Sequence, residues 1–327
     1  MPQTPMRPHR RRGDYVEGED AALAKTAPPT WSHAVEAFLR DSRSRSCSPA
    51  TIGNYRTYLL GRRAEQFLRD HKIRSVADVT PGKLRDFQAE LLEAGLSVGT
   101  AATFHRIIRN FLGFCRREGW GVGAETLEVV PLRQEAVLPE VFTEAEEQHI
   151  LEAARTGRDR FLIEFMLRTG LRLSEVAAVT VDDIVTGTEG AYLRVRQGKG
   201  SDDRIVPLDT GTYRFSQTLQ SYLRNDRPVT AKDRHLFLST RRDPVTGEYG
   251  ALERQGIKML LRRIGQDTGI HVHAHKCRNT FATRALVAGV DPLVLQRALG
   301  HSTLAMVDRY AHSQARDPLD AWRARLD

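Results

Sequence analysis

The residues with the clearest chemical potential form a run of cationic side chains that ends at a tyrosine. Along the chain the run reads Arg172, Lys199, His275, Arg278, His301 and Tyr310. Each arginine guanidinium can pair with two phosphate oxygens at once, so two arginines suit the binding of a phosphodiester. A tyrosine placed beside that group can attack it and form a covalent intermediate. No cluster of carboxylates accompanies these residues, so the sequence does not indicate a two-metal mechanism.

The sequence around this run resembles the tyrosine recombinases, also called phage-integrase-type site-specific recombinases. Three local contexts carry the resemblance: TGLRLSE around Arg172, GKGSDDRIVPL around Lys199, and LGHSTLAMVDRY leading to the tyrosine. These specific motifs cover roughly residues 140–312, and residues 30–120 match more loosely. One departure is Asn279, where many members of the family have a second histidine, at a position that varies among them.

The resemblance implies a role for each residue of the run. Arg172 and Arg278 would hold the non-bridging oxygens of the scissile phosphate and stabilise the added charge of a pentacoordinate transition state. Lys199, at the tip of a predicted hairpin, would protonate the departing 5′ oxygen. Tyr310 would be the nucleophile and would form a 3′-phosphotyrosyl link beside a free 5′-hydroxyl. Because one phosphodiester replaces another, the bond energy is retained and religation needs no ATP. The resemblance implies no metal or nucleotide cofactor.

The remaining polar residues of the motifs would support this reaction. His275 precedes Arg278 by three residues, on the same face of a predicted helix, and would exchange a proton with Tyr310. His301 would donate to a non-bridging phosphate oxygen. Glu175 would orient an arginine from behind, and a capping or salt-bridge role is a compatible alternative. The phenol of tyrosine has an ordinary pKa of about 10, so the nucleophile needs cationic neighbours or a base.

A second pattern of possible ligands overlaps this run. His271, His273, His275 and Cys277 alternate, so an extended strand would place four metal-ligand types on one face. A zinc site requires ligands that wrap a tetrahedron, which consecutive alternating positions rarely provide. Gly269 and the helical pattern after His275 also break the alternation. We therefore expect no metal site here.

Composition indicates a soluble protein with a polyanionic partner. Lys and Arg number 49 against 41 Asp and Glu, and the net charge of +8 favours a partner such as nucleic acid. No apolar run approaches the roughly 20 residues of a membrane span, and the basic N-terminus lacks the apolar segment of a secretory signal. Cys47, Cys115 and Cys277 are scattered, which fits a reduced cytoplasm. We expect a cytoplasmic protein that associates with the nucleoid when it binds DNA.

The N-terminal part of the chain is predicted to be helical. Residues 1–29 are predicted to be a flexible basic tail, residues 30–120 a four-helix unit similar to the core-binding (SAM-like) DNA-binding domain of the family, and residues 121–140 a linker. The four helices begin at Thr30 or Ser32, Ser48, Thr80 and Ser97, whose side chains can cap them. The candidate phosphate contacts, with solvated surface charge as the alternative, are Arg56, Lys83, Arg106, Arg109 and Arg116.

Residues 141–327 are predicted to be the catalytic domain. Thr143 and Glu146 form a capping-box pattern, and a buried helix over 159–169 ends at Gly170. The strands AYLRVRQ and RIVPLD flank the turn GKGSDD, and HLFLS is a further strand. Helices are expected over 251–267, 275–288, 292–299, 302–311 and 317–325. The expected fold is therefore mostly α with a small antiparallel β-sheet, in a two-domain clamp with an α+β catalytic domain.

The sequence thus predicts a site-specific DNA recombinase that assembles as a homo-tetramer on two double-stranded recombination sites and passes through a Holliday junction. Its C-terminal helix would pack on its own domain or dock on a neighbouring protomer. The task would be integration, excision or resolution of mobile DNA, with an accessory protein possible for direction. Two alternatives stay open, a type IB topoisomerase-like nicking-closing enzyme and a non-catalytic DNA-binding protein on a recombinase scaffold.

Overall fold

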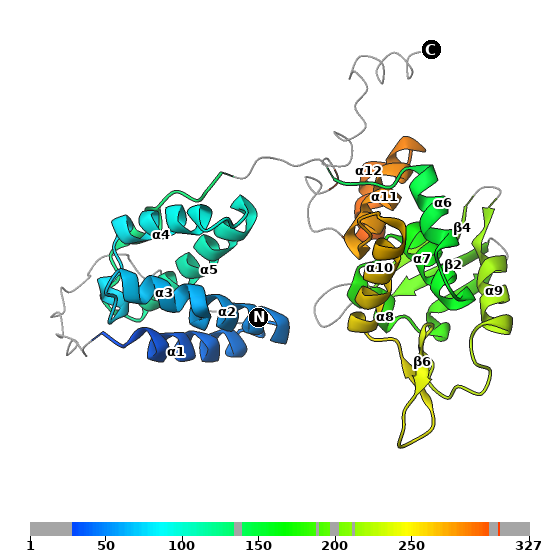
Figure 1. Cartoon of the computed structure of the whole chain (residues 1–327), viewed down its shortest axis with the longest axis horizontal. Helices are drawn as coiled ribbons and strands as arrows, with labels where there is room; N and C mark the ends of the chain where they lie inside the picture. Colours follow the sequence, from blue (N-terminus) through cyan, green and yellow to red (C-terminus); the bar gives the residue numbers. More distant parts are fainter. Residues whose placement is uncertain are drawn as a thin grey trace, which may run out of the picture. The chain divides into compact units, whose positions relative to one another are not determined.

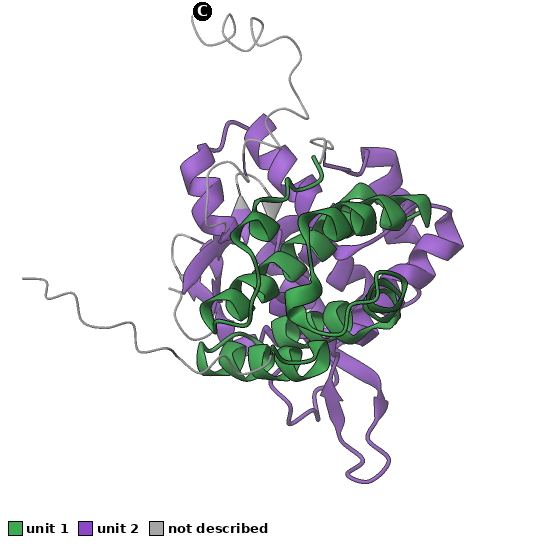
Figure 2. Ribbon diagram, turned by 90° about the vertical axis from the view of Figure 1, so that its left-hand side faces the viewer, with its two compact units in different colours: residues 1–136 green, residues 137–327 purple. Residues whose placement is uncertain are grey.

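The chain divides into two compact units, residues 1–136 and residues 137–327 (Figure 2). The computed structural model describes residues 28–133, 139–187, 190–196, 203–210, 213–300 and Val307. Of the predicted tail, residues 1–29, all but the last two residues lie outside the described part. No helix within the described ranges is both long and apolar enough to cross a membrane.

The first unit is built from helices around an aromatic core (Figure 1). The described elements are α1 (Trp31–Ser44), α2 (Pro49–Leu60), α3 (Arg62–Asp70), α4 (Pro81–Glu93) and α5 (Val98–Arg117), with short 3-10 helices at Val76–Asp78 and Ala124–Glu128. Trp31 packs edge-on against Phe111, with ring centroids 4.8 Å apart, and Phe67 lies 4.4 Å from Phe87. These four rings come from α1, α3, α4 and α5, so burial of aromatic surface ties the helices together.

The helix starts of this unit follow the predicted caps. The side chains of Thr30, Ser48, Thr80 and Ser97 each accept a hydrogen bond from a backbone N–H of the first turn. One prediction was wrong, because the single helix predicted to begin at Ser48 is two helices, α2 and α3. Gly61 separates them with extended backbone angles, φ −81° and ψ 168°, and a Cβ at this position would lie 2.3 Å from the Thr57 carbonyl oxygen. The described unit therefore has five α-helices rather than four.

The segment predicted as a linker begins as part of the first unit. Val122 and Val129 are buried in the core of that unit, and Leu127 packs against the same core. The Thr126 hydroxyl donates to the Val79 carbonyl oxygen at 3.4 Å. The first part of the segment predicted as a linker over residues 121–140 therefore belongs to the first unit, because its apolar residues pack against the helices of that unit.

The second unit places helices around a three-stranded antiparallel sheet in the order β1 (Ile184–Gly187), β2 (Gly190–Val195), β3 (Arg204–Pro207). β2 and β3 are the two strands of the predicted hairpin, and Val195 pairs with Arg204 in its register. The turn between them, which carries Lys199, lies outside the described residues. Smaller pairs are β4 (Asp209–Thr210) with β5 (Tyr213–Arg214), and β6 (Leu238–Arg242) with β7 (Tyr249–Ala251). The strand expected over HLFLS overlaps β6 only at its end.

The helices of this unit are α6 (Glu144–Glu152), α7 (Gly157–Thr169), α8 (Leu173–Ala178), α9 (Phe215–Asn225), α10 (Arg254–Thr268), α11 (Ala274–Val287) and α12 (Pro292–Leu299), with a short 3-10 helix at Val181–Asp183. α7 is the central helix and packs against α6, α9 and α11 (Figure 1). Thr143 and Glu146 form the predicted capping box at the start of α6. The helices expected over 302–311 and 317–325 lie outside the described residues, apart from Val307.

Candidate active site

Arg172 is fixed at the junction of two helices. α7 ends at Gly170, which has left-handed angles with φ +60°, and Arg172 is the N-cap residue of α8. Its backbone N–H donates to Glu175 Oε2 at 2.7 Å, and its Nη1 donates to Glu175 Oε1 at 2.9 Å. Glu175 therefore caps α8 and at the same time fixes the guanidinium, whose side chain remains 40% exposed.

Arg278 reaches the same place from α11. Its Nη1 donates to the Gly170 carbonyl oxygen at 2.7 Å, and its Nη2 donates to the Leu299 carbonyl oxygen at 2.7 Å. Arg172 Nη2 donates to the next carbonyl oxygen, that of Gly300. The structure thus brings the two predicted phosphate-binding arginines together at the C-terminal ends of α7 and α12.

A third arginine joins this cluster, and sequence reasoning missed it. Arg204 begins β3, its Nη1 and Nη2 donate to the Glu175 carboxylate at 2.9 and 2.7 Å, and its Nε donates to the Ala298 carbonyl oxygen at 2.7 Å. The signal lay in strand alternation, because Arg204 and Val206 are buried while Ile205 between them is exposed. An arginine at an inward-facing strand position requires a partner inside the protein.

The end of α12 is held by these three side chains. Arg204, Arg278 and Arg172 donate to the carbonyl oxygens of Ala298, Leu299 and Gly300, respectively. The last carbonyls of a helix have no acceptor role within the helix, so side-chain donors satisfy them. The anchored end leads directly into His301, which lies outside the described residues, as do Lys199 and Tyr310.

His275 stands in the first turn of α11, one helical turn before Arg278, and part of its ring is exposed. The protein atoms packed around the ring, and then the charge of Arg278, lower the pKa of His275 below its ordinary value. A lower pKa favours the neutral imidazole near neutral pH, the form that can accept a proton. The adjoining Asn279 is buried and its side-chain N–H donates to the Glu140 carbonyl oxygen at 3.2 Å.

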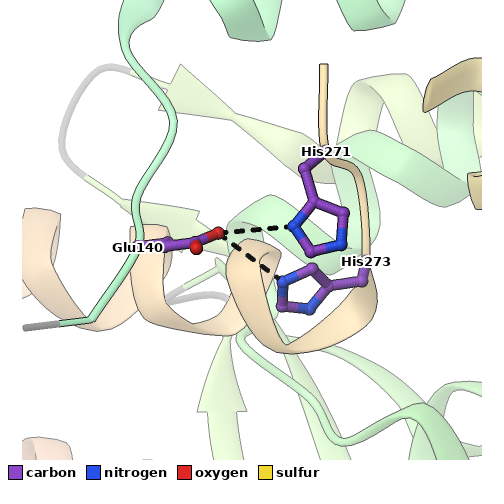
Figure 3. A group of neighbouring side chains, drawn as sticks. All are labelled: Glu140, His271 and His273. Carbon is purple, nitrogen blue, oxygen red and sulfur yellow. Dashed lines mark ion pairs between the residues drawn. The ribbon is translucent and has the colours of Figure 1, made fainter. Parts of the chain in front are cut away.

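Figure 3 shows a group of side chains with possible metal ligands beside this helix, Glu140, His271 and His273. Glu140 Oε2 lies 3.5 Å from His271 Nδ1 and 4.0 Å from His273 Nε2. His273 is also the N-cap residue of α11, where its Nδ1 accepts the backbone N–H of Lys276 at 3.2 Å. A neutral ring that accepts at Nδ1 carries its proton on Nε2, the atom that faces the carboxylate. In this arrangement His273 therefore offers Glu140 a proton rather than a lone pair for an ion.

The alternating ligand pattern weighed in the sequence does not persist in the structure. α11 begins at Ala274, so the extended spacing ends before His275. Cys277 is fully buried, and its burial raises the pKa of the thiol to about 12, whereas His271 is exposed. These positions therefore do not face one common point.

The candidate DNA contacts of the first unit separate into two groups. Arg106 and Arg109 line one groove of about 710 Å³ along α5, and Arg116 is exposed further along the same helix. Arg56 instead pairs with Glu36 at 3.1 Å, and Lys83 Nζ donates to the Asp78 carbonyl oxygen at 2.9 Å. The structure brings Arg106 and Arg109 together, and it gives Arg56 and Lys83 partners within the unit.

A basic stripe on α10 was also missed. Arg254, Lys258 and Arg262 are exposed and follow one another at intervals of four residues, so they share one face of the helix. Two hollows of about 680 and 990 Å³ meet at this stripe, and both are lined by Leu173 and Lys258. Leu173 follows Arg172, so the concave basic surface adjoins the arginine cluster. The four-residue spacing was visible in the sequence.

An arginine cluster beside a basic concave surface is compatible with a protein that acts on phosphodiesters. Comparison with known proteins gives the class. The model of the Phage integrase family matches residues 140–317, and that of the Phage integrase, N-terminal SAM-like domain matches residues 35–119. The chain therefore belongs to the phage integrase family of tyrosine recombinases, enzymes that cleave and rejoin DNA at specific sites.

Individual relatives agree with this assignment. Tyrosine recombinase XerA of Pyrococcus horikoshii is 30% identical over 226 residues, which cover 68% of this chain and 73% of the relative. Tyrosine recombinase XerC of Bacillus subtilis is 30% identical over 241 residues, which cover 70% and 75%. A lambda integrase tetramer bound to a Holliday junction has the same fold, with a TM-score of 0.66, 18% identity, and coverage of 84% of this chain and 78% of that one. The predicted family and fold class are confirmed.

Proposed function

We propose that this recombinase exchanges DNA strands through a covalent Tyr310 intermediate, with the scissile phosphate held by Arg172 and Arg278. The observation that carries the proposal is that these two arginines meet at the end of α12, where they donate to Leu299 and Gly300. Tyr310 follows Gly300 by ten residues in the sequence. A phosphate at this place would face two fixed cations, and fixed charge stabilises a pentacoordinate transition state without reorganisation.

The proposed step balances as a transesterification. The Tyr310 oxygen attacks phosphorus, the bond from phosphorus to the 5′ oxygen breaks, and the phenolic proton passes to the neutral ring of His275. Lys199 gives its proton to the departing 5′ oxygen, and His301 donates to a non-bridging oxygen. The reverse reaction with the 5′-hydroxyl of another strand releases Tyr310, so the energy of the bond is retained.

The DNA would contact both units through their basic surfaces. Arg106 and Arg109 on α5, with Arg116 nearby, suit the phosphates beside the first unit, and the stripe on α10 suits those beside the arginine cluster. In the proposal four protomers act on two double-stranded sites and pass through a Holliday junction, as the lambda integrase tetramer is bound to one. The substrate would be mobile DNA in the cytoplasm, in integration, excision or resolution.

A covalent trap in EDTA tests the proposal. Wild type and Tyr310→Phe are incubated with a pool of nicked duplexes of randomised sequence, and the products are separated on a denaturing gel. We expect a protein–DNA adduct with wild type and none with Tyr310→Phe, and sequencing of the trapped DNA identifies the site. An adduct that persists in Tyr310→Phe, or wild type that binds DNA without forming one, would overturn the proposal.

The trapped sequence then separates recombination from nicking and closing. A plasmid with two copies of the site and a plasmid with one copy are each incubated with wild type. Joining or deletion between two copies is expected for a recombinase. Relaxation of the one-copy plasmid without any exchange on the two-copy plasmid would favour the topoisomerase-like alternative.

A further inference from the structure

Arg204 lies five residues after Lys199 in the sequence, and its side chain is 7% exposed. All three of its side-chain nitrogens have acceptors, two on the Glu175 carboxylate and one on the Ala298 carbonyl oxygen. We infer that Arg204 is a positioning residue for strand cleavage, because it holds Arg172 and the end of α12 in one arrangement. The inference rests on the proposed function for the reaction that is positioned.

The first part of this role is mechanical. Each oxygen of the Glu175 carboxylate accepts one hydrogen bond from Arg172 and one from Arg204, so four bonds hold the carboxylate in one orientation. Without Arg204 the carboxylate keeps two bonds and regains rotation about its last side-chain torsions. Because Glu175 fixes the Arg172 guanidinium, rotation of the carboxylate would also let the guanidinium move, and this guanidinium is the group that would contact the phosphate.

The second part is electrostatic. Burial alone would raise the pKa of Glu175, but the hydrogen bonds and charges of Arg204 and Arg172 outweigh it and hold the pKa below its ordinary value. The carboxylate is therefore ionised, and alone it would weaken the attraction of Arg172 for a phosphate. Arg204 offsets that charge, so the three groups carry a net charge of +1.

The third part concerns the chain that leads to the nucleophile. Arg204 donates to Ala298, and the two candidate phosphate-binding arginines take the next two carbonyls, Leu299 and Gly300. One buried side chain thus links three segments, the strand after the Lys199 turn, the start of α8 and the end of α12. These segments are far apart in sequence, and each carries or adjoins a residue of the proposed reaction.

The protein contains a matched control for a purely structural ion pair. Arg158 is also largely covered, with a side chain 14% exposed; it donates to the Asp159 carboxylate through Nε and Nη2, and to the Leu238 carbonyl oxygen at 2.8 Å. It therefore repeats the partners of Arg204, one carboxylate and one carbonyl, without contact to the arginine cluster. Arg158→Lys reports the general effect of replacing a largely covered guanidinium in this unit.

The test compares Arg204→Lys with Arg158→Lys in the full chain. Lysine keeps the positive charge but lacks the planar guanidinium that can donate to both oxygens of a carboxylate. Folding of each variant is monitored by thermal melting, and DNA affinity by fluorescence anisotropy with a random duplex. Cleavage is measured as the single-turnover rate of adduct formation on the randomised nicked pool at saturating protein. We expect Arg204→Lys to cleave about 10- to 100-fold more slowly, the range found for residues that orient the ligands of a metal site. Its DNA affinity should stay within about twofold of the wild-type value. Arg158→Lys should cleave near the wild-type rate.

Equal rates for Arg204→Lys and wild type, or an equal loss in Arg158→Lys, would overturn the inference. Glu175→Gln is the second variant, because it keeps the shape of the acceptor and should show the same loss. The double variant with Arg204→Lys should lose little more than either single one, since both act through the same contact. Additive losses would contradict the proposed route through Glu175.

Hydrogen exchange distinguishes failure of this inference from failure of the proposed function. If wild type forms no adduct, the proposed function fails, but the anchoring of α12 can still be measured without DNA. Peptides over residues 292–300 should exchange faster in Arg204→Lys than in wild type, and unchanged in Arg158→Lys. Equal exchange in all three proteins would overturn the positioning role by itself.

Discussion

Replacement of Gly170 by alanine should destabilise the second unit more than an ordinary C-cap substitution does. Gly170 has φ +60°, a left-handed conformation that costs a residue with a Cβ about 1–2 kcal/mol. The added Cβ would also lie 2.4 Å from Phe281 Cδ1 and 3.0 Å from Leu299 Cδ2, and overpacking of this kind costs about 1–3 kcal/mol. We therefore expect Gly170→Ala to lower the free energy of unfolding by about 2–5 kcal/mol.

Gly269 provides the control for the backbone part of this loss. It ends α10 with φ +71°, and no atom lies within 4 Å of a Cβ built there, so Gly269→Ala should lose only about 1–2 kcal/mol. Pulsed hydrogen exchange over a urea series, read by mass spectrometry on peptides of residues 139–300, measures this unit separately from the first. Equal losses in the two variants would refute the crowding of Gly170 by Phe281 and Leu299.

Three further predictions concern charge and reactivity. Because the pKa of Glu175 is lowered, its contribution to stability is present above the ordinary glutamate pKa of about 4.3 and is lost as the pH falls through the folded-state value. In urea unfolding between pH 3 and 6, the free energy of unfolding of Glu175→Gln should therefore fall less steeply with acid than that of wild type. Identical slopes would contradict this. Native Cys277, buried and with its pKa raised to about 12, should react with iodoacetamide at pH 8 far more slowly than partly exposed Cys47, and equal rates would refute its burial. Arg106→Gln should reduce the slope of log affinity for DNA against log salt by about 1, whereas Arg56→Gln, whose arginine pairs with a glutamate, should reduce it less; equal reductions would argue against the α5 groove.

Contacts between residues close in sequence predicted where the helices begin. They did not predict features that depend on packing between helices. A cap is a contact between residues three apart, so Ser48 and Thr80 could be recognised from the sequence. The break at Gly61 could not, because the apolar residues Leu59 and Phe67 keep a helical spacing across it. α2 packs on α1 and α5, and the sequence gives no direct sign of that packing.

The candidate site shows the same division between local and distant contacts. The pairing of Arg172 with Glu175 spans three residues, so spacing alone indicated that they could meet. The bond from Arg278 to Leu299 spans 21 residues, and that from Arg204 to Ala298 spans 94. Such contacts depend on how α12 packs against β3 and α11. Motif reasoning therefore singled out the candidate residues but not Arg204, which contacts Glu175 and the end of α12.

The structure gives the two candidate phosphate-binding arginines different exposure to solvent. The Arg172 side chain is 40% exposed while it donates to Glu175 and Gly300, and the next residue, Leu173, lines the basic hollows. Arg278 is 3% exposed and donates to two backbone carbonyls. A guanidinium has five N–H donors, so neither arginine needs to give up every protein contact to accept a phosphate. Within the proposed function, Arg172 is the more accessible of the two to a phosphate, and Arg278 contributes its positive charge from a buried position. The carbonyl oxygens at the end of α12 accept from both arginines and so keep the two charges close to one another.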